Sequence, residues 1–155
     1  MHIQAARIRF AELGEAESIA KLSRDTIEVG LPWRWQPPEI ERFIRSNRHN
    51  VIVAHDSAHM VGFAVMAYGD DDAYLALLAV LPSHRRQGVA KALLAWLLKT
   101  ADVAGIAAVS VELREDNLAA LHLYKAAGFV EHSRKTGAYY GRVNQIRMRF
   151  QLRPA

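Results

Sequence analysis

The sequence predicts an α/β fold with the element order β-α-α-β-β-β-α-β-α-β-β. Stretches in which apolar residues alternate with polar ones, or follow one another without a break, indicate about seven strands. Stretches in which apolar residues recur every three or four positions indicate about four helices. The strand, helix and strand between residues 73 and 114 have the order of a right-handed crossover, and such units bind ligands at the carboxyl end of the first strand.

The N-terminal half contains two helices between strands. Gly30-Leu31-Pro32 stops the first helix, and Pro37-Pro38 begins the second, because proline is tolerated in a first helical turn. A short polar turn at residues 56–58 joins the next two strands into a hairpin. The expected elements are a strand over Ala6–Phe10, helices over Glu15–Glu28 and Pro37–Ile44, and strands over Val51–His55 and His59–Tyr68.

The C-terminal half begins with a strand so apolar that it should lie in the centre of the sheet. Glycines follow the ends of both later helices, where a left-handed residue commonly ends a helix. The expected elements are strands over Ala73–Val80 and Ala107–Arg114, helices over Val89–Ala104 and Asn117–Ala127, and final strands over Phe129–Tyr139 and Gly141–Leu152.

Length and composition fit one soluble domain over residues 1–155, with 51% hydrophobic and 23% charged residues. The lack of cysteine excludes a disulfide, a thiolate metal site and a cysteine nucleophile. Residues 1–7 do not resemble a signal peptide, and no segment approaches about 18 uncharged apolar residues. We therefore expect a cytoplasmic protein that does not bind a membrane.

The net charge of +4 is a weak indication of an acidic ligand. Arg147, Arg149 and Arg153 alternate with apolar residues, which is typical of a strand with one solvated face rather than of a nucleic-acid patch. We therefore expect no nucleic-acid partner. The alternating last strand could face water or pair with another subunit, which leaves a monomer and a homodimer both open.

The sequence does not predict a metal site. Its histidines lack the H-x-x-x-H spacing of helical zinc ligands, and Asp70-Asp71-Asp72 lacks the remaining ligands of a calcium loop. We expect a solvated turn at the three aspartates. Surface or satisfied core positions are expected for His49, His55, His59, His84, His122 and His132.

Val80 to Ala90, V-L-P-S-H-R-R-Q-G-V-A, ends an apolar strand with a basic turn that opens directly into a helix. The first turn of a helix carries N–H groups without intrahelical partners and the positive end of the helix dipole. Arg85, Arg86 and the bare backbone at Gly88 would therefore concentrate hydrogen-bond donors around a diphosphate. The alternative is a solvated loop in which the glycine only eases a tight bend.

A second motif makes the interpretation specific. The pattern R-x-x-G-x-A at Arg85, Gly88 and Ala90 is followed by N-x-x-A-x-x-x-Y-x-x-x-G-F, which contains Asn117, Ala120, Tyr124, Gly128 and Phe129. Together these motifs resemble the acyl-CoA site of the GNAT superfamily of N-acetyltransferases. The pattern is similar to that of bacterial enzymes that acetylate ribosomal-protein N-termini, and it covers nearly the whole chain.

The resemblance implies an α/β (α+β) fold of GNAT type, with a mixed, mostly antiparallel central sheet of about seven strands flanked by about four helices. It also implies acetyl-CoA as co-substrate, with its pantetheine arm beside the strand over residues 73–80 and its diphosphate on the basic turn. Backbone N–H groups near Leu78 to Val80 would polarise the thioester carbonyl. The implied acetyl-CoA contacts are Leu78, Ala79, Val80, Arg85, Arg86, Gln87, Gly88, Val89, Ala90, Asn117 and Ala120.

Amine acetylation needs a base, because an α-amine titrates at about 8 and a lysine at about 10.4. Glu112, twelve residues before Tyr124, matches the base-to-acid spacing of the ribosomal-protein enzymes, with Tyr124 as the acid that protonates the CoA thiolate. We expect Val109, Val111 and Leu113 to surround Glu112. Alternatively, Glu112 pairs with Arg114 or a lysine, and a water chain serves as the base. The alternative for Tyr124 is a tyrosine that only packs the helix against the sheet.

The acceptor amine is less defined. The resemblance places it against the loop between the first two helices and against the last hairpin, which makes Trp33, Trp35, Tyr139 and Tyr140 candidate substrate contacts. These aromatic residues favour a peptide N-terminus, although they could also simply pack the loop. A polyamine would need an acidic pocket, for which Glu28 and Asp70 to Asp72 are the candidates, and an amino acid or antibiotic amine stays open.

Two non-enzymatic alternatives remain. An acyl-CoA-binding regulatory module would keep the phosphate-binding turn but would not need both Glu112 and Tyr124. A nucleotide-binding protein ranks last, because the chain lacks G-x-x-x-x-G-K-[ST] and G-x-G-x-x-G.

Overall fold

Seven strands form one sheet in the order β1-β2-β3-β4-β5-β7-β6 in the computed structural model, which describes residues 6–57, 59–139 and 143–154. β4 and β5 are parallel, whereas the β1–β2, β2–β3, β5–β7 and β6–β7 pairs are antiparallel. The strands are β1 (Arg7–Phe10), β2 (His49–Asp56), β3 (His59–Tyr68), β4 (Asp72–Val80), β5 (Ala108–Arg114), β6 (Val130–Tyr139) and β7 (Val143–Gln151).

Four α-helices accompany the sheet in the described part of the chain, so the prediction of a mixed, mostly antiparallel sheet with about four helices is confirmed. The helices are α1 (Ala16–Thr26), α2 (Pro37–Arg45), α3 (Val89–Val103) and α4 (Leu118–Ala127), and two 3-10 turns are η1 (Leu13–Glu15) and η2 (Pro82–His84). β4 lies in the centre of the sheet, as its continuous apolar sequence predicts. In the described residues, no helix combines the length and the hydrophobicity needed to cross a membrane.

Residue contacts divide the chain into two compact units, each built from two stretches of sequence. The first unit consists of residues 1–67 and 76–97, and the second unit of residues 68–75 and 98–155. β4 and α3 each contribute to both units. The single acetyltransferase domain over residues 1–155 stays a prediction.

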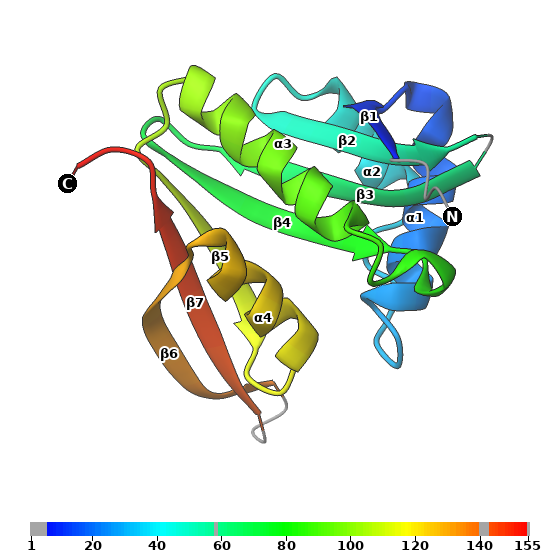
Figure 1. Cartoon of the computed structure of the whole chain (residues 1–155). Helices are drawn as coiled ribbons and strands as arrows, with labels where there is room; N and C mark the ends of the chain where they lie inside the picture. The colour runs from blue at the N-terminus through cyan, green and yellow to red at the C-terminus, as the bar shows by residue number, and fades with distance from the viewer. Residues whose placement is uncertain (1–5, 58, 140–142, 155) are drawn as a thin grey trace. The chain divides into compact units, whose positions relative to one another are not determined.

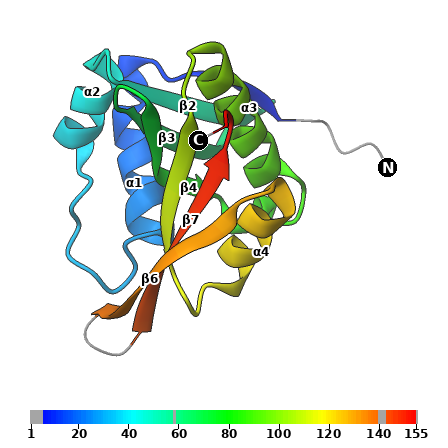
Figure 2. The ribbon, with the colours of Figure 1, turned by 90° about the vertical axis from the view of Figure 1, so that its left-hand side faces the viewer.

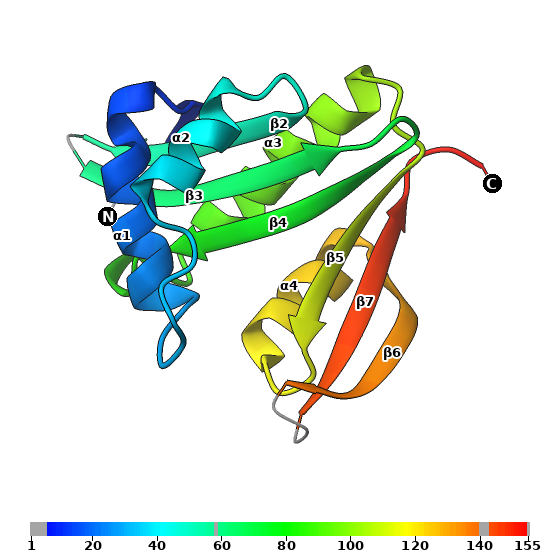
Figure 3. The same cartoon turned by 180° about the vertical axis from the view of Figure 1, so that it is seen from behind.

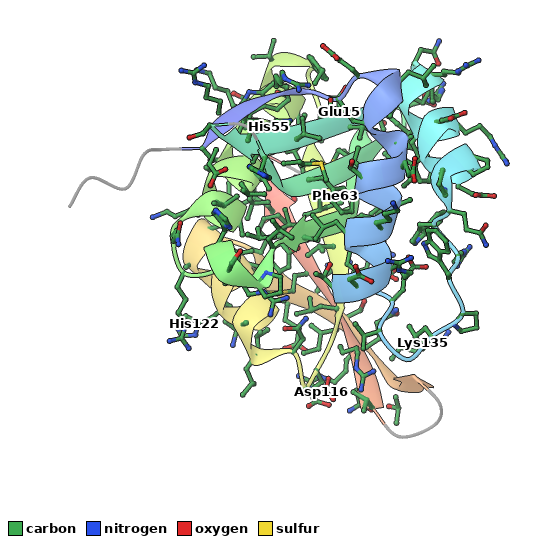
Figure 4. The ribbon with its side chains drawn as sticks, turned by 90° about the vertical axis from the view of Figure 1, so that its right-hand side faces the viewer. Glu15, His55, Phe63, Asp116, His122 and Lys135 are labelled. Atoms are coloured by element: carbon green, nitrogen blue, oxygen red, sulfur yellow. The ribbon has the colours of Figure 1, made fainter. Side chains whose placement is uncertain are left out.

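The first unit is a layer of strands between helices. α1 and α2 cover one face of β2 and β3, and the N-terminal part of α3 covers the other (Figures 1 and 3). Phe63 on β3 is completely buried in the cluster that α1 and α2 close (Figure 4). The apolar stripe predicted for α1 faces this cluster through Ile19, Ala20 and Leu22, and burial of this stripe stabilises the helix.

The first turn of α3 packs very closely on the sheet at Gly62. A Cβ atom added to Gly62 would lie 2.9 Å from the carbonyl oxygen of Ala79, 3.2 Å from Leu93 Cδ1 and 3.3 Å from Val89 Cγ1. Protein interiors are packed too densely to absorb an additional methyl group without a shift of the surroundings. Gly62 therefore sets how near the start of α3 lies to β3 and β4.

Arg9, Glu15 and His55 form a polar cluster beside β1 and β2, where Figure 4 shows Glu15 and His55 next to each other. Arg9 donates to both Glu15 carboxylate oxygens at 2.7 and 3.1 Å, and the Glu12 backbone N–H donates to Glu15 at 2.8 Å. Burial alone would raise the pKa of Glu15, but the hydrogen bonds from Arg9, Glu12 and His55 outweigh it and lower this pKa to about 2. The η1 turn that contains Glu15 begins the element predicted as a helix over residues 15–28, which ends earlier, at Thr26.

The second unit places α4 against one face of β5, β7 and β6 (Figures 2 and 3). The buried ring of Tyr124 packs against Phe129 with ring centroids 5.3 Å apart, and Phe129 packs against Phe150 at 5.4 Å. Gly128 ends α4 in the left-handed conformation, with φ at 107°, as the sequence predicts. The interior of this unit is thus partly aromatic.

Candidate functional site

The turn between β4 and α3 leads through two left-handed residues directly into the first turn of the helix. Arg86 and Gly88 both adopt the left-handed backbone conformation, with φ of 62° and 81°. α3 starts directly afterwards, and the Ala92 N–H donates to the Gly88 carbonyl at 2.9 Å. The N–H groups of Val89, Ala90 and Lys91 therefore precede the first intrahelical bond and are available to a ligand.

The side chains of this turn are exposed from Arg85 to Gly88, whereas Val89 is buried and Ala90 is half-buried. A small residue at position 90 leaves the backbone of the first turn accessible. Two arginines, a helix start and exposed backbone donors give this turn the chemistry to bind a diphosphate.

His84 anchors the turn to the β2–β3 connection. Its Nε2 lies 2.5 Å from Asp56 Oδ2, and its Nδ1 lies 2.8 Å from Ser83 Oγ. The Leu81 N–H also donates to the Val61 carbonyl at 2.8 Å. His84 is thus a satisfied polar residue that fixes the position of the basic turn.

The end of β4 leads directly into this turn. Ala79 and Val80 are buried, and Leu78 is half-buried. The end of β4 and the basic turn, which the sequence resemblance assigns to the same acetyl-CoA molecule, therefore both lie in the first unit.

Glu112 lies on β5 in the second unit, with two polar neighbours that the sequence did not assign to it. The Tyr74 hydroxyl is 3.5 Å from Glu112 Oε2, and an Arg147 guanidinium nitrogen is 3.9 Å from Oε1. Tyr74 comes from β4, and Arg147 is the direct partner of Glu112 across β5 and β7. The carboxylate is 30% exposed and so remains open to a ligand on one side.

The expected surroundings of Glu112 need a correction. Val111 and Leu113 adjoin Glu112 in a strand, where successive side chains point to opposite faces, so they do not pack around its carboxylate. Arg114, the alternative partner of Glu112, donates to both oxygens of Asp116 at 3.0 Å. Figure 4 shows Asp116 at the loop that follows β5.

Tyr124 is 5% exposed, and its ring packs against Phe129. In the described part of the chain no fully enclosed side-chain nitrogen or oxygen lacks a hydrogen-bond partner. Burial, with a smaller contribution from Tyr74, raises the pKa of Tyr124. Tyr124 is thus a neutral phenol that keeps its proton.

Asn117 and Ala120 form the start of α4. The Asn117 side-chain oxygen accepts from the Ala120 N–H at 3.1 Å, which is the helix cap that the sequence allowed as one of two roles. Both residues lie at the exposed end of α4, with Asn117 exposed and Ala120 half-buried.

The loop between α1 and α2 carries the two candidate tryptophans. Trp33 Nε1–H donates to the Ala20 carbonyl at 3.2 Å, and Trp35 contacts Phe43 with ring centroids 5.4 Å apart. Both side chains are half-buried and pack against the core of the first unit. Tyr139 ends β6 opposite Val143, and Tyr140 lies outside the described residues.

Two of the acidic candidates for a polyamine pocket, Glu28 and Asp72, make internal contacts. The Glu28 carboxylate is buried and accepts hydrogen bonds from Ser23 of α1 and from two backbone N–H groups of the following loop. Asp72 pairs with Arg149 at 3.4 Å, and the Asp71 carbonyl accepts from the Ala107 N–H. Asp70 and Asp71 lie in the predicted turn, whereas Asp72 already begins β4. Among the described residues, no three metal-ligating side chains come together, and His122 lies on the surface of α4 (Figure 4).

Comparison with known families agrees with the two motifs. The profile described as the acetyltransferase (GNAT) family matches residues 16–129, which is most of the chain. The chain therefore belongs to this family, and the membership predicted from the motifs is confirmed.

Individual relatives of the chain are also N-acetyltransferases by name. Over 80 residues the chain is 36% identical to the ribosomal protein bS18-alanine N-acetyltransferase of Escherichia coli, covering 52% of this chain and 54% of that protein. The chain thus spans about half the length of the curated relatives it matches. The crystal structure of the Escherichia coli ribosomal-protein-S18-alanine N-acetyltransferase is similar over 97% of this chain and 96% of that chain, with 27% identity and a TM-score of 0.80. Ard1 from Thermoplasma volcanium has 26% identity and a TM-score of 0.83, covering 96% and 98%.

Proposed function

We propose that this protein is an acetyl-CoA-dependent N-acetyltransferase of the cytoplasm that modifies a primary amine, with a protein or peptide N-terminus as the acceptor. The observation that carries the proposal is the pair of groups in the second unit. Glu112 presents a partly exposed carboxylate, and Tyr124 presents a buried phenol that desolvation keeps neutral. A protein that only bound acyl-CoA would need neither group.

The basic turn supplies the contacts for the donor. The unbonded N–H groups of Val89, Ala90 and Lys91 and the exposed side chains of Arg85 and Arg86 bind the diphosphate of acetyl-CoA. Leu78, Ala79 and Val80 contact the pantetheine arm, and their backbone N–H groups polarise the thioester carbonyl. Gln87, Gly88, Asn117 and Ala120 complete the donor contacts proposed from the motifs.

The reaction is a direct transfer within a ternary complex. Glu112 accepts a proton from the ammonium form of the acceptor, and the freed nitrogen attacks the thioester carbon. The resulting C–N bond is retained when the C–S bond breaks, and Tyr124 donates its proton to the leaving thiolate. The products are the N-acetylated amine and free CoA. The second proton, which the nitrogen loses after the C–N bond has formed, restores the Tyr124 hydroxyl through water, and the proton held by Glu112 is released to water.

Tyr74 and Arg147 orient the Glu112 carboxylate in this scheme. The hydroxyl of Tyr74 contacts one oxygen and the guanidinium of Arg147 approaches the other. A carboxylate between two donors loses rotational freedom, which keeps its lone pairs directed toward the acceptor.

A peptide acceptor is favoured over a polyamine. The similarity to an enzyme that acetylates the N-terminal alanine of a ribosomal protein supports it, and so does the engagement of Glu28 and Asp72 in internal contacts. Trp33, Trp35, Tyr139 and Tyr140 are the proposed acceptor contacts. An amino acid or antibiotic amine is the second candidate, because the half-buried tryptophans would also fit a compact acceptor.

A substrate screen tests the proposal. Acetyl-CoA is mixed with a peptide that begins with alanine, the same peptide with a blocked N-terminus, a lysine peptide, spermidine and small amines, and thiol release is followed. We expect turnover with the free N-terminus and none with the blocked peptide. Tight acetyl-CoA binding without turnover on any amine would instead identify an acyl-CoA-binding module.

A further inference from the structure

The buried carboxylate of Glu28 lies two residues after α1 and has no role in the scheme above. It is 6% exposed and accepts three hydrogen bonds. The Ser23 hydroxyl donates to Oε2 at 2.9 Å, and the backbone N–H groups of Arg34 and Trp35 donate to Oε1 at 2.6 and 3.1 Å. One side chain therefore joins the end of α1 to the far side of the following loop.

No ion pair to Glu28 is present among the described residues, so neutral donors alone compensate its charge. Removal of a carboxylate from water is costly unless its hydrogen bonds are complete. The carboxylate therefore fixes the conformation of the backbone that contributes the two bonded N–H groups. Those groups belong to the segment that carries Trp33 and Trp35.

The side chains of Trp33 and Trp35 make further contacts that hold the same loop. The Trp33 indole donates to the Ala20 carbonyl, and the guanidinium of Arg24 lies 5.2 Å from the Trp33 ring centre. The guanidinium of Arg34 lies 4.7 Å from the Trp35 ring centre. These contacts place the rings, but the backbone between them is bonded to α1 through Glu28.

We propose that Glu28 is a positioning residue for the acceptor amine. Its carboxylate holds the backbone at Arg34 and Trp35 so that the two tryptophans are preformed to receive the acceptor. This inference rests on the proposed function, in which Trp33 and Trp35 contact the acceptor. Preorganisation of a binding loop lowers the entropic cost of binding, so its loss weakens acceptor binding.

Steady-state kinetics of three variants test the role. Glu28→Ala leaves two backbone N–H groups and the Ser23 hydroxyl without their acceptor, and we expect the KM for the acceptor peptide to rise by about tenfold or more. The KM for acetyl-CoA should stay within about twofold, because the donor contacts lie elsewhere. Ser23→Ala removes one of the three bonds and should give a smaller increase of the acceptor KM.

Glu28→Gln separates the hydrogen bonds from the charge. Its amide oxygen can accept from the two backbone N–H groups, while its amide nitrogen can donate to the Ser23 oxygen. We expect this variant to restore the acceptor KM to within about threefold of the wild-type value. A Glu28→Gln enzyme as impaired as Glu28→Ala would overturn the inference, because the charge and not the loop conformation would then matter.

Glu17→Ala is the matched control, because Glu17 is a 70% exposed glutamate on α1 that pairs with Lys21. Its kinetics should equal those of the wild type. Hydrogen exchange at the Arg34 and Trp35 amides gives a readout that needs no turnover, and it should accelerate in Glu28→Ala and recover in Glu28→Gln.

The outcomes separate the two proposals. If the wild-type protein acetylates no amine, the proposed function fails, and the acceptor role of Glu28 fails with it even if the exchange rates change. If the wild type is active and Glu28→Ala accelerates exchange with an unchanged acceptor KM, or raises both KM values equally, only the positioning role is overturned.

Discussion

Replacement of Gly62 by alanine tests how the fold holds the start of α3 in place. The added Cβ would lie 2.9 Å from the Ala79 carbonyl oxygen, a backbone atom that can move only with β4. It would also crowd Leu93 and Val89 at 3.2 and 3.3 Å, both on the first turns of α3. The helix must therefore move outward by several tenths of an ångström.

The expected magnitude follows from this overpacking. Extra methyl groups in a dense core cost about 1–3 kcal/mol, so we expect the free energy of unfolding to fall by about 2 kcal/mol. For a chain of this length this corresponds to a decrease in Tm of about 4–8 °C. Because Val89 and Ala90 supply N–H groups to the basic turn, we also expect the acetyl-CoA Kd to rise by about tenfold.

Differential scanning calorimetry and titration calorimetry with acetyl-CoA measure the two effects. Gly14→Ala is the matched control, since a Cβ there meets no atom within 4 Å and its backbone is not left-handed. A Gly62→Ala protein with the Tm and acetyl-CoA affinity of Gly14→Ala would refute the argument that close packing at Gly62 sets the position of α3.

Three further predictions concern single side chains. Tyr124→Phe should lower kcat by about 10- to 100-fold with acetyl-CoA affinity and Tm nearly unchanged, because phenylalanine keeps the ring that packs against Phe129. A large loss of Tm would point to a structural role of the hydroxyl. Arg86→Gly should change the unfolding free energy by less than about 1 kcal/mol, since relief of the left-handed strain offsets the entropy of glycine. The same variant should bind acetyl-CoA more weakly in calorimetry, and an unchanged affinity would exclude Arg86 as a contact. Glu15, with its pKa lowered from 4.5 to about 2, stabilises the fold above pH 4.5 and loses this effect as the pH falls toward 2. In acid unfolding, Glu15→Gln should therefore flatten the plot of unfolding free energy against pH between these values. A plot parallel to that of the wild type would contradict the role of Glu15.

Local sequence signals predicted the elements whose formation depends on their own residues. The uninterrupted apolar run of β4 predicts a central strand, and Asn117 and Gly128 mark both ends of α4 as the structure has them. The left-handed backbone at Gly88 and the start of α3 at Val89 likewise follow from the basic turn. These features depend on capping and hydrophobic periodicity, which one sequence displays directly.

The surroundings of the candidate catalytic groups could not be read in the same way. Arg147 faces Glu112 only because β5 and β7 pair in one particular register, and Tyr74 approaches it from β4. Glu28 looks like a carboxylate at a helix end until the loop folds back and gives it two backbone donors. Each case depends on tertiary contacts between distant residues, which local patterns do not encode.

The central claim is that Glu112 and Tyr124 serve acetyl transfer to an N-terminal amine. The most direct test incubates the wild-type protein with acetyl-CoA and an alanine-initiated peptide and locates the product by mass spectrometry. We predict one acetyl group on the α-amine, with release of one thiol per acetylated peptide, and a strongly slowed rate at neutral pH for Glu112→Gln. Acetyl-CoA bound tightly with neither thiol release nor a modified peptide, or a Glu112→Gln enzyme that turns over like the wild type at every pH, would contradict the claim.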